Sequence, residues 1–385
     1  QRRRQPVRVG RRHLLIFARA SAEPQPRSRP LVLGAVSTRP FFAARVEEAV
    51  DRRVESFLRA LGWTEKVICY TGYGTAASAR VLGRVILVPR RARTGIGRAT
   101  EEIIRRRGFR NFVGAACVRV PVTIWIGDQE VHSVTDRGGY IDLRVRQPHL
   151  EPGWQTFRVR SAGSEVAKGR VEIVADDVRF GLVSDIDDTV ISTWLPRPLI
   201  AAWNSFIRDE SARRAVPGMA RLYQQLLAEH PGAPVMYIST GAWNTHGFLD
   251  RFLSRHGFPP GPMLLTDWGP TNTGWFRSGM AHKAETLLQL TRDFPNISWV
   301  LVGDDGQHDL SIYSDFARVA PDRVRAIAIR QLSPAEQVLA HGTNTTLNEQ
   351  DDVAPEIALV LAPDGRGLLS GLRSLEPGPN DVEER

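Results

Sequence analysis

Lysine, cysteine and long apolar runs are all scarce in this chain of 385 residues. Its two cysteines, Cys69 and Cys117, neither require nor exclude a disulfide, and no Cys/His spacing is typical of a zinc site. No stretch reaches the roughly 18 consecutive apolar residues of a membrane-spanning helix. The apolar run at residues 14–18 is also too short for a secretory signal. These absences argue against a helical membrane protein and favour a cytoplasmic location.

Basic charge comes almost entirely from arginine and is concentrated at the start of the chain. There are 48 arginines against three lysines, Lys66, Lys168 and Lys283. Residues 1–110 hold 25 basic and 8 acidic residues, a net charge of +17, although the whole chain carries only +9. The arginines near the amino terminus are suited to an anionic membrane surface, where each cation contributes about 1 kcal/mol. A solubilising or nucleic-acid-attracting tail is the alternative, although no nucleic-acid recognition motif is present.

The middle of the chain contains two kinds of periodic pattern. Apolar positions recur every three or four residues over 42–61, with arginines between them, which predicts an amphipathic helix. Such a helix either packs on its own domain or lies on a membrane. Residues 111–174 contain short alternating runs separated by turn signals, which predict a small β-sandwich. We expect this sandwich to brace the part of the chain that follows it, while contact with carbohydrate or lipid is the alternative.

After residue 177, apolar strand patterns alternate with helical spacing. Alternating strands and helices predict an α/β domain with a doubly wound, largely parallel, Rossmann-like sheet, whose ligands bind beyond the carboxyl ends of the strands. The length and 42% apolar content allow two or three domains. The predicted divisions are a basic, flexible arm at 1–41, a helix and connecting segment at 42–109, the sandwich at 110–177, the α/β domain at 178–332, and a linker and tail at 333–385.

A pair of carboxylates lies at the predicted end of the first strand of this domain. Residues 184–190 read Ser-Asp-Ile-Asp-Asp-Thr-Val and follow the apolar run at 180–183. On an extended segment, Asp185 and Asp187 share one face, where their charges repel unless a partner uses them. A divalent cation such as Mg²⁺, held by carboxylates and a phosphate, is the usual partner. Thr189 adds a hydroxyl just past the strand. The alternative is a purely structural role, in which an Asp-rich turn caps a helix.

Hydroxyl groups and a lysine follow in the next segments. The apolar run at 234–238 ends in Ser239, Thr240 and Gly241, where a hydroxyl or a backbone amide is suited to a phosphate oxygen. Lys283 opens a segment with apolar residues at helical spacing. Because lysine is so rare in this chain, an ammonium at this position is less easily explained as surface filler. We expect it to neutralise a phosphoryl group.

A second acidic cluster follows the apolar strand pattern at 297–302. The chain continues as Gly-Asp-Asp-Gly-Gln-His-Asp over 303–309, which places Asp304, Asp305 and Asp309 at or just after a strand end. Taken singly, each of these strand-end residues would be ordinary. Their order along the chain is the informative observation.

The order Asp-x-Asp-x-Thr, Ser/Thr, Lys and Gly-Asp-Asp resembles the four motifs of the haloacid dehalogenase superfamily of phosphoryl-transfer enzymes over residues 178–332. The closer resemblance is to bacterial members of the actin-patch-protein type of Mg²⁺-dependent phosphatidate phosphatases. It is carried by residues 72–75, 81–85, 138–140, 237–239, 266–269, 282–283 and 303–309. The sequence departs from the family pattern at 240–243 and at Asp305, which leaves open whether Ser239 or Thr240 contacts phosphate.

The resemblance implies hydrolysis of phosphatidate to diacylglycerol and phosphate. Asp185 would be the nucleophile and Asp187 the acid and base. Mg²⁺ would be bound by Asp185, the backbone carbonyl of Asp187 and Asp304, with Asp305 or Asp309 completing its surroundings. Ser239, Thr240 and Lys283 would hold the phosphoryl oxygens, with Thr189 beside them.

The spacing of the motifs leaves no room for a large closing cap, and an open site suits a bulky substrate such as a membrane lipid. Trp194 and Trp203, with their apolar neighbours, are candidates for a rim that contacts acyl chains or the bilayer, although packing of a flap on the core is the alternative. A phosphatase of soluble sugar, nucleotide or protein phosphates would use the same motifs. A non-enzymatic adaptor for membranes or polyanions is a further alternative.

Overall fold

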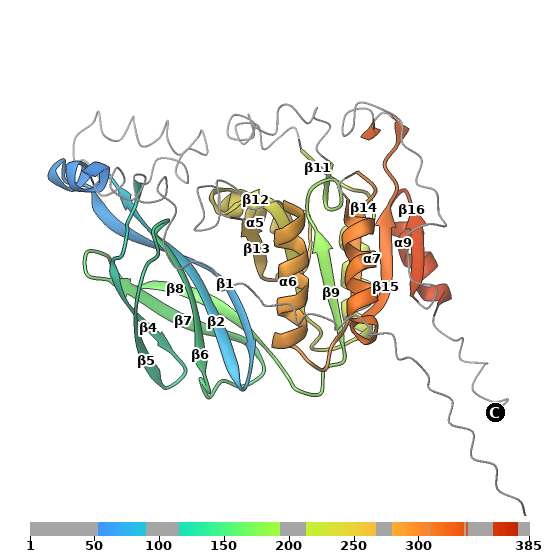
Figure 1. Cartoon of the computed structure of the whole chain (residues 1–385), viewed down its shortest axis with the longest axis horizontal. Helices are drawn as coiled ribbons and strands as arrows, with labels where there is room; N and C mark the ends of the chain where they lie inside the picture. Colours follow the sequence, from blue (N-terminus) through green and yellow to red (C-terminus); the bar gives the residue numbers. More distant parts are fainter. Residues whose placement is uncertain are drawn as a thin grey trace, which may run out of the picture. The chain divides into compact units, whose positions relative to one another are not determined.

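The computed structural model describes residues 53–89, 115–192, 213–266, 279–306, 308–334, 336–337 and 357–375. These residues form two separate sheets with helices packed against the second one (Figure 1). The fold is therefore mixed α/β, as the sequence predicts. No helix within the described part of the chain is long and apolar enough to cross a membrane.

The first sheet is curled and mostly antiparallel. Its strands run in the order β3-β2-β1-β8-β7-β4-β5, and β6 pairs with β2. All neighbouring pairs are antiparallel except β1 and β8, which are parallel. The strands are β1 (Thr64–Thr75), β2 (Ser78–Val88), β3 (Ala115–Ala116), β4 (Pro121–Ile126), β5 (Gln129–Val134), β6 (Tyr140–Arg146), β7 (Gly153–Ser161) and β8 (Ala167–Val174).

This sheet differs from the predicted small sandwich. The strand patterns at 140–145, 156–159 and 170–173 form strands, and the pattern at 118–126 forms one from residue 121 onward. The strands β1 and β2 join them in one continuous hydrogen-bonded sheet. The first hairpin is hard to predict because glycines interrupt its alternation. Gly74 is needed because β1 and β2 approach so closely that a Cβ there would lie 2.2 Å from the carbonyl oxygen of Ser78.

The predicted amphipathic helix at 42–61 is only partly within the described residues. Residues 53–60 are helical, and the preceding residues lie outside the described part. Leu58 packs against the core of the first sheet, whereas Val54, Phe57 and Leu61 are exposed. Arg59 ties the helix to the sheet, because its guanidinium donates to Glu55 and Glu65.

The second sheet is entirely parallel, with the strand order β13-β12-β9-β14-β15-β16. The predicted strand patterns at 180–183, 234–238, 297–302 and 326–329 all fall within it. Residues 358–374, for which the sequence pattern predicts only a linker and tail, add its last strand and a helix. The strands are β9 (Phe180–Asp185), β12 (Val235–Ala242), β13 (Met263–Thr266), β14 (Ser298–Asp304), β15 (Val324–Arg330) and β16 (Ala358–Ala362).

Helices cover both faces of the parallel sheet (Figure 1). On one face, residues such as Leu182 and Val300 pack with α4, α5 and α9. On the other face, Val183 and Leu301 pack with α6 and α7. Both faces are apolar because every strand alternates between two buried layers. The helices are α4 (Met219–Glu229), α5 (His246–Arg255), α6 (Gly279–Asp293), α7 (Asp309–Val319) and α9 (Gly365–Ser374).

Hydrogen bonds and ring contacts join the first sheet to the elements of the second. The Tyr73 hydroxyl donates to Asp293 Oδ2 at 3.0 Å, and Arg144 Nη2 donates to the same oxygen at 2.5 Å. The Tyr70 ring stacks on Trp243 with ring centroids 4.5 Å apart. Because Trp243 directly follows β12, this stacking supports the loop that leaves the strand end carrying Ser239.

Candidate active site

Asp185 is the last residue of β9, a central strand whose six residues are all buried. The chain then turns back on itself. The N–H groups of Val190 and Ile191 both donate to the carbonyl of Ile186, at 2.9 and 3.0 Å. Asp188 completes this turn with a φ of 57°, a left-handed conformation that Asp adopts more readily than most residues. The turn keeps Asp187 buried beside Asp185 at the carboxyl edge of the sheet.

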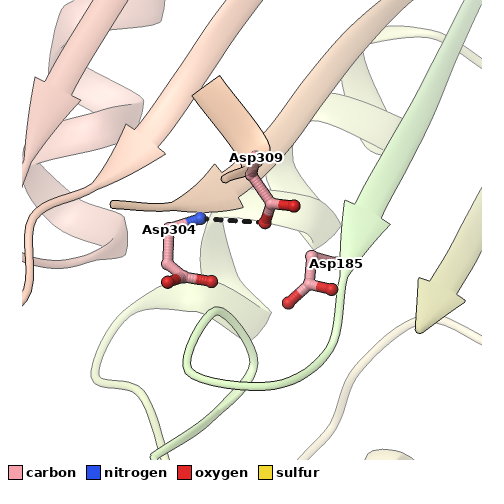
Figure 2. Close-up of side chains that lie close together, drawn as sticks. All are labelled: Asp185, Asp304 and Asp309. Carbon is pink, nitrogen blue, oxygen red and sulfur yellow. Dashed lines mark hydrogen bonds between the residues drawn. The ribbon is translucent and has the colours of Figure 1, made fainter. Parts of the chain in front are cut away.

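Three carboxylates from separate segments converge at this edge (Figure 2). Asp185 lies at the end of β9, Asp304 at the end of β14 and Asp309 at the start of α7. One oxygen atom from each lies within 4.8 Å of the others, and all three side chains are buried. The backbone N–H of Asp304 donates to Asp309 Oδ2 at 3.3 Å (Figure 2). The structure therefore brings Asp185, Asp304 and Asp309 together at this edge.

Lys283 provides the positive charge next to these carboxylates. It lies in the second turn of α6, is only 2% exposed, and places Nζ 2.6 Å from Asp185 Oδ1 and 2.5 Å from Asp309 Oδ1. Burial alone would lower the pKa of this ammonium, but the two adjoining carboxylates raise it above its ordinary value. Lys283 is therefore charged at neutral pH.

Burial raises the pKa of Asp185 well above its ordinary value, Lys283 opposes that rise, and Asp309 and Asp187 add to it. The pKa of Asp304 is also raised well above its ordinary value, mainly by burial and then by the charges of Asp309 and Asp185. Asp185 Oδ2 has no hydrogen-bond donor among the described residues. A buried carboxylate oxygen without a donor, in a group of three carboxylates, fits a divalent cation that prefers oxygen ligands.

Asp187 faces Ser239. Ser239 lies in β12, and its Oγ donates to Asp187 Oδ2 at 2.9 Å while accepting from the Gly241 N–H at 2.9 Å. Burial raises the pKa of Asp187, and the hydrogen bond from Ser239 acts against that rise. The Thr240 side chain is packed against Gly279 at the start of α6. A Cβ at Gly279 would lie only 2.5 Å from Thr240 Cγ2. Ser239 is thus the hydroxyl that faces Asp187.

The remaining predicted residues fall into three groups. Thr189 is buried, and its Oγ1 donates to Asp304 Oδ2 at 3.4 Å. Asp305 does not join the carboxylate group. Its side chain instead accepts from the Leu332 N–H at 2.8 Å and from Gln337, so it organises the segment after β15. Trp194 and Trp203 lie outside the described residues.

Arg213 is a site residue that sequence reasoning missed. It is buried immediately before β11 (Arg214–Ala215), which pairs with β10 (Ile191–Ser192) next to the Asp187 turn. Its guanidinium lies 4.6 Å from the centre of the Phe248 ring. Burial lowers the pKa of Arg213, and the nearby Asp187 acts in the opposite direction. No sequence signal distinguishes it among 48 arginines.

Two features explain how the site is supported. Tyr223 in α4 shares a 2.6 Å hydrogen bond with Ser184, the residue before Asp185. Arg330, at the end of β15, donates to the carbonyl of Asp188 at 2.6 Å and to Glu336 at 2.6 Å. Both contacts fix the backbone on either side of Asp185 and Asp187. Such support restricts the positions of the reacting groups.

Comparison with known proteins finds a family that is similar to this part of the chain. Residues 180–331 match the family described as the catalytic domain of phosphatidate phosphatase APP1. This match covers the parallel sheet up to the end of β15 together with all of the site residues discussed above. It agrees with the family resemblance found in the sequence.

Two individual proteins are similar to part of the chain. Phosphatidate phosphatase APP1 of Saccharomyces cerevisiae is 29% identical over 178 residues, covering 45% of this chain and 30% of the yeast protein. An uncharacterized protein of Schizosaccharomyces pombe is 24% identical over 160 residues, covering 41% of this chain and 26% of that protein. The matched region therefore spans less than a third of the length of both relatives.

Solved structures are less similar. A crystal structure of an uncharacterized protein from Listeria monocytogenes serotype 4b has a TM-score of 0.32 and 14% identity, covering 51% of this chain and 98% of that one. The HAD domain of the effector protein Lem4 from Legionella pneumophila has a TM-score of 0.30 and 14% identity, covering 40% of this chain and 87% of that one. Similarity at this level does not assign a fold.

Proposed function

We propose that this protein is a Mg²⁺-dependent phosphatase that hydrolyses phosphatidate to diacylglycerol and phosphate, using a catalytic domain of the haloacid dehalogenase type. One observation carries the proposal: Asp185, Asp304, Asp309 and Lys283 come from four separate segments and meet at the carboxyl edge of the parallel sheet. Ligands of open α/β sheets bind at this edge. The family match over residues 180–331 supports the same activity.

The metal-binding residues would be Asp185 and Asp304, with Asp309 beside them. When bound, a divalent cation supplies positive charge that favours the ionised form of these carboxylates and offsets the charge of the phosphoryl group. The donor set fits such an ion because three buried carboxylates need more positive charge than the single ammonium of Lys283 provides.

In the first half of the proposed reaction, a carboxylate oxygen of Asp185 attacks phosphorus. The bond between phosphorus and the glyceride oxygen breaks, and an aspartyl-phosphate forms. Asp187 gives its proton to the departing glyceride oxygen. The environment of Asp187 suits this role, because burial raises the pKa of its carboxyl group and so favours the protonated form.

In the second half, water attacks the phosphorus of the aspartyl-phosphate. Asp187, now ionised, takes a proton from this water, and the bond to Asp185 breaks to release phosphate. Ser239 stabilises the ionised state of Asp187 that takes this proton, because its hydroxyl donates to the Asp187 carboxylate at 2.9 Å. The two steps together consume one water and return both aspartates to their starting forms.

Cations and hydroxyls around Asp185 and Asp187 are suited to the phosphoryl oxygens. Lys283 contacts Asp185 directly, and Ser239 contacts Asp187. We also assign Arg213 to this group, since its buried guanidinium acts electrostatically on Asp187. Charge neutralisation of this kind provides most of the catalysis in phosphoryl transfer.

Phosphate release is the assay that tests this function. The protein should be offered phosphatidate in mixed micelles and, separately, a panel of soluble sugar, nucleotide and protein phosphomonoesters, first with Mg²⁺ and then with EDTA. We expect hydrolysis of phosphatidate that depends on Mg²⁺. Asp187→Asn should lower the rate by about 10²–10⁴-fold, the range for loss of a general acid and base, and Asp185→Asn should abolish it.

Asp250→Asn is the matched control, because Asp250 is an exposed aspartate in α5 and should leave the rate unchanged. Hydrolysis of soluble phosphomonoesters but not of phosphatidate would refute the lipid substrate and retain a phosphatase. Full activity of folded Asp185→Asn would refute the proposed nucleophile.

A further inference from the structure

The outward face of the first sheet carries four cations on two adjacent strands. Arg158 and Arg160 lie on β7, and Lys168 and Arg170 lie on β8. All four side chains are exposed, while the residues between them in the sequence are buried or partly buried against the core. Alternation along each strand therefore places these cations on one face.

The strand register shows which side chains are direct neighbours on this face. Arg158 lies opposite Lys168 on β8 and opposite Trp125 on β4. Arg160 lies opposite Thr123, and Arg170 lies opposite Thr156. Residues directly opposite on antiparallel strands share a face. We call the set Trp125, Trp154, Arg158, Arg160, Lys168 and Arg170 the cationic face.

Two tryptophans lie among these cations. The guanidinium carbons of Arg158 and Arg160 lie 5.5 and 5.8 Å from the centre of a Trp125 ring. The guanidinium carbon of Arg170 lies 4.2 Å from the centre of a Trp154 ring. These cation–π contacts hold the arginines against the sheet and keep the charges close together.

Among the residues that the structure describes, acidic groups compensate this charge only weakly. Glu130 on the adjoining strand β5 accepts from Trp125 Nε1 at 2.9 Å. Glu172 lies opposite Trp154, and burial raises its pKa to about 8, so it carries little charge at neutral pH. The pairing of Arg158 with Lys168 is itself unfavourable, since like charges directly opposite destabilise a sheet. A fold that keeps this arrangement despite its cost indicates a use for the charge.

We propose that the cationic face docks on an anionic lipid bilayer and holds the enzyme at the membrane that contains its substrate. The choice of a lipid partner rests on the proposed phosphatidate phosphatase function. Arginine and lysine are attracted to anionic headgroups, and tryptophan prefers the boundary between headgroups and acyl chains. The face combines both residue types on a rigid sheet.

Nucleic acid fits this surface less well. Proteins that bind single strands offer open aromatic faces on which bases stack. Here, guanidinium groups lie over the rings of both Trp125 and Trp154. Phosphate contacts alone would remain available, and the lipid bilayer is the anionic partner that also accommodates the indole rings.

Vesicle co-sedimentation in EDTA tests the proposal without catalysis. The full chain should bind vesicles of phosphatidylcholine with one-third phosphatidylserine and not those of phosphatidylcholine alone. Phosphatidylserine is not a phosphomonoester, so binding to it does not depend on the proposed activity. The test variant carries Arg158→Gln, Arg160→Gln, Lys168→Gln and Arg170→Gln. The control variant loses four exposed arginines of the other domain, through Arg221→Gln, Arg255→Gln, Arg292→Gln and Arg366→Gln.

Each surface cation contributes about a fivefold factor to partitioning. We therefore expect the test variant to bind at least about tenfold more weakly than the control variant, with unchanged circular dichroism and unchanged hydrolysis of phosphatidate in mixed micelles. Equal binding by the two variants would overturn the proposal and assign any attraction to other basic residues. Binding to duplex DNA should be measured for the same two variants. If the test variant loses binding to duplex DNA but binds vesicles as well as the control variant does, the proposal is overturned in favour of a nucleic-acid partner.

Discussion

The ion pairs of Lys283 give a quantitative prediction. Lys283→Met removes the ammonium that lies 2.6 Å from Asp185 and 2.5 Å from Asp309, and it keeps a side chain of similar length. Both carboxylates are almost fully buried and cannot exchange the lost partner for water. Breaking one side of a buried ion pair costs about 3–5 kcal/mol. Since a typical domain is stable by about 5–15 kcal/mol, the variant should fold with a much smaller margin.

Urea unfolding followed by circular dichroism at neutral pH measures this loss. Mg²⁺ should restore part of it, because a cation that binds only the folded state adds about 2.7 kcal/mol at a hundredfold excess over its dissociation constant. The gain should be larger in Lys283→Met than in the parent, since the variant has no ammonium beside the carboxylates. Lys66→Met, at an exposed lysine of β1, is the control and should change stability by less than about 0.5 kcal/mol.

A loss below about 1 kcal/mol for Lys283→Met in EDTA would contradict this reasoning, because breaking a buried ion pair costs several times more. An equal gain from Mg²⁺ in parent and variant would show that the ammonium and the cation do not act on the same carboxylates.

Two further predictions concern Arg213 and Glu172. Arg213→Gln should lower kcat/KM for phosphatidate about 10–100-fold, the equivalent of one hydrogen bond to a charged group. Arg214→Gln, at the adjacent exposed residue, is the control and should have little effect. Similar kinetics for both variants would show that Arg213 does not take part in catalysis. Burial raises the pKa of Glu172 to about 8, so the unfolded chain loses this proton at lower pH than the folded protein, and stability falls as pH rises from about 5 to about 8. Glu172→Gln should therefore gain stability relative to the parent as pH rises over that range, by about 4 kcal/mol at pH 8 in thermal unfolding. The exposed Glu165→Gln should not. A pH-independent difference would show that Glu172 is ionised in the folded protein.

Much of the parallel sheet and the catalytic motifs could be predicted from the sequence for a physical reason. Buried parallel strands are continuous apolar runs, and ligand-binding residues of such sheets follow the strand ends. Asp185, Ser239 and Asp304 were therefore predictable from their positions after such runs. The structure also separates Asp305 from Asp304, since adjacent residues at a strand end point in different directions.

Other features leave no local signal. The position of Arg213 depends on the pairing of β10 with β11, and one arginine among many has no distinguishing spacing. The hairpin of β1 and β2 is hard to predict because glycines interrupt its strand pattern. A glycine is needed at position 74 because the two strands approach closely there, which only the folded structure shows. The strand β16 is only five residues long, too short a run to be distinguished from a tail without its partner β15.

The carboxyl-terminal helix α9 has a consequence for how fragments of this protein behave. The N–H of Gly365 donates to the carbonyl of Pro217 at 3.0 Å, and a Cβ at Gly365 would lie 2.3 Å from the carbonyl carbon of Gly218. The family match ends at residue 331, before this contact. A recombinant fragment cut at that boundary would expose one edge of β15 and release the segment that follows Arg213. Protein produced for crystallisation or kinetics therefore needs to extend at least through Ser374.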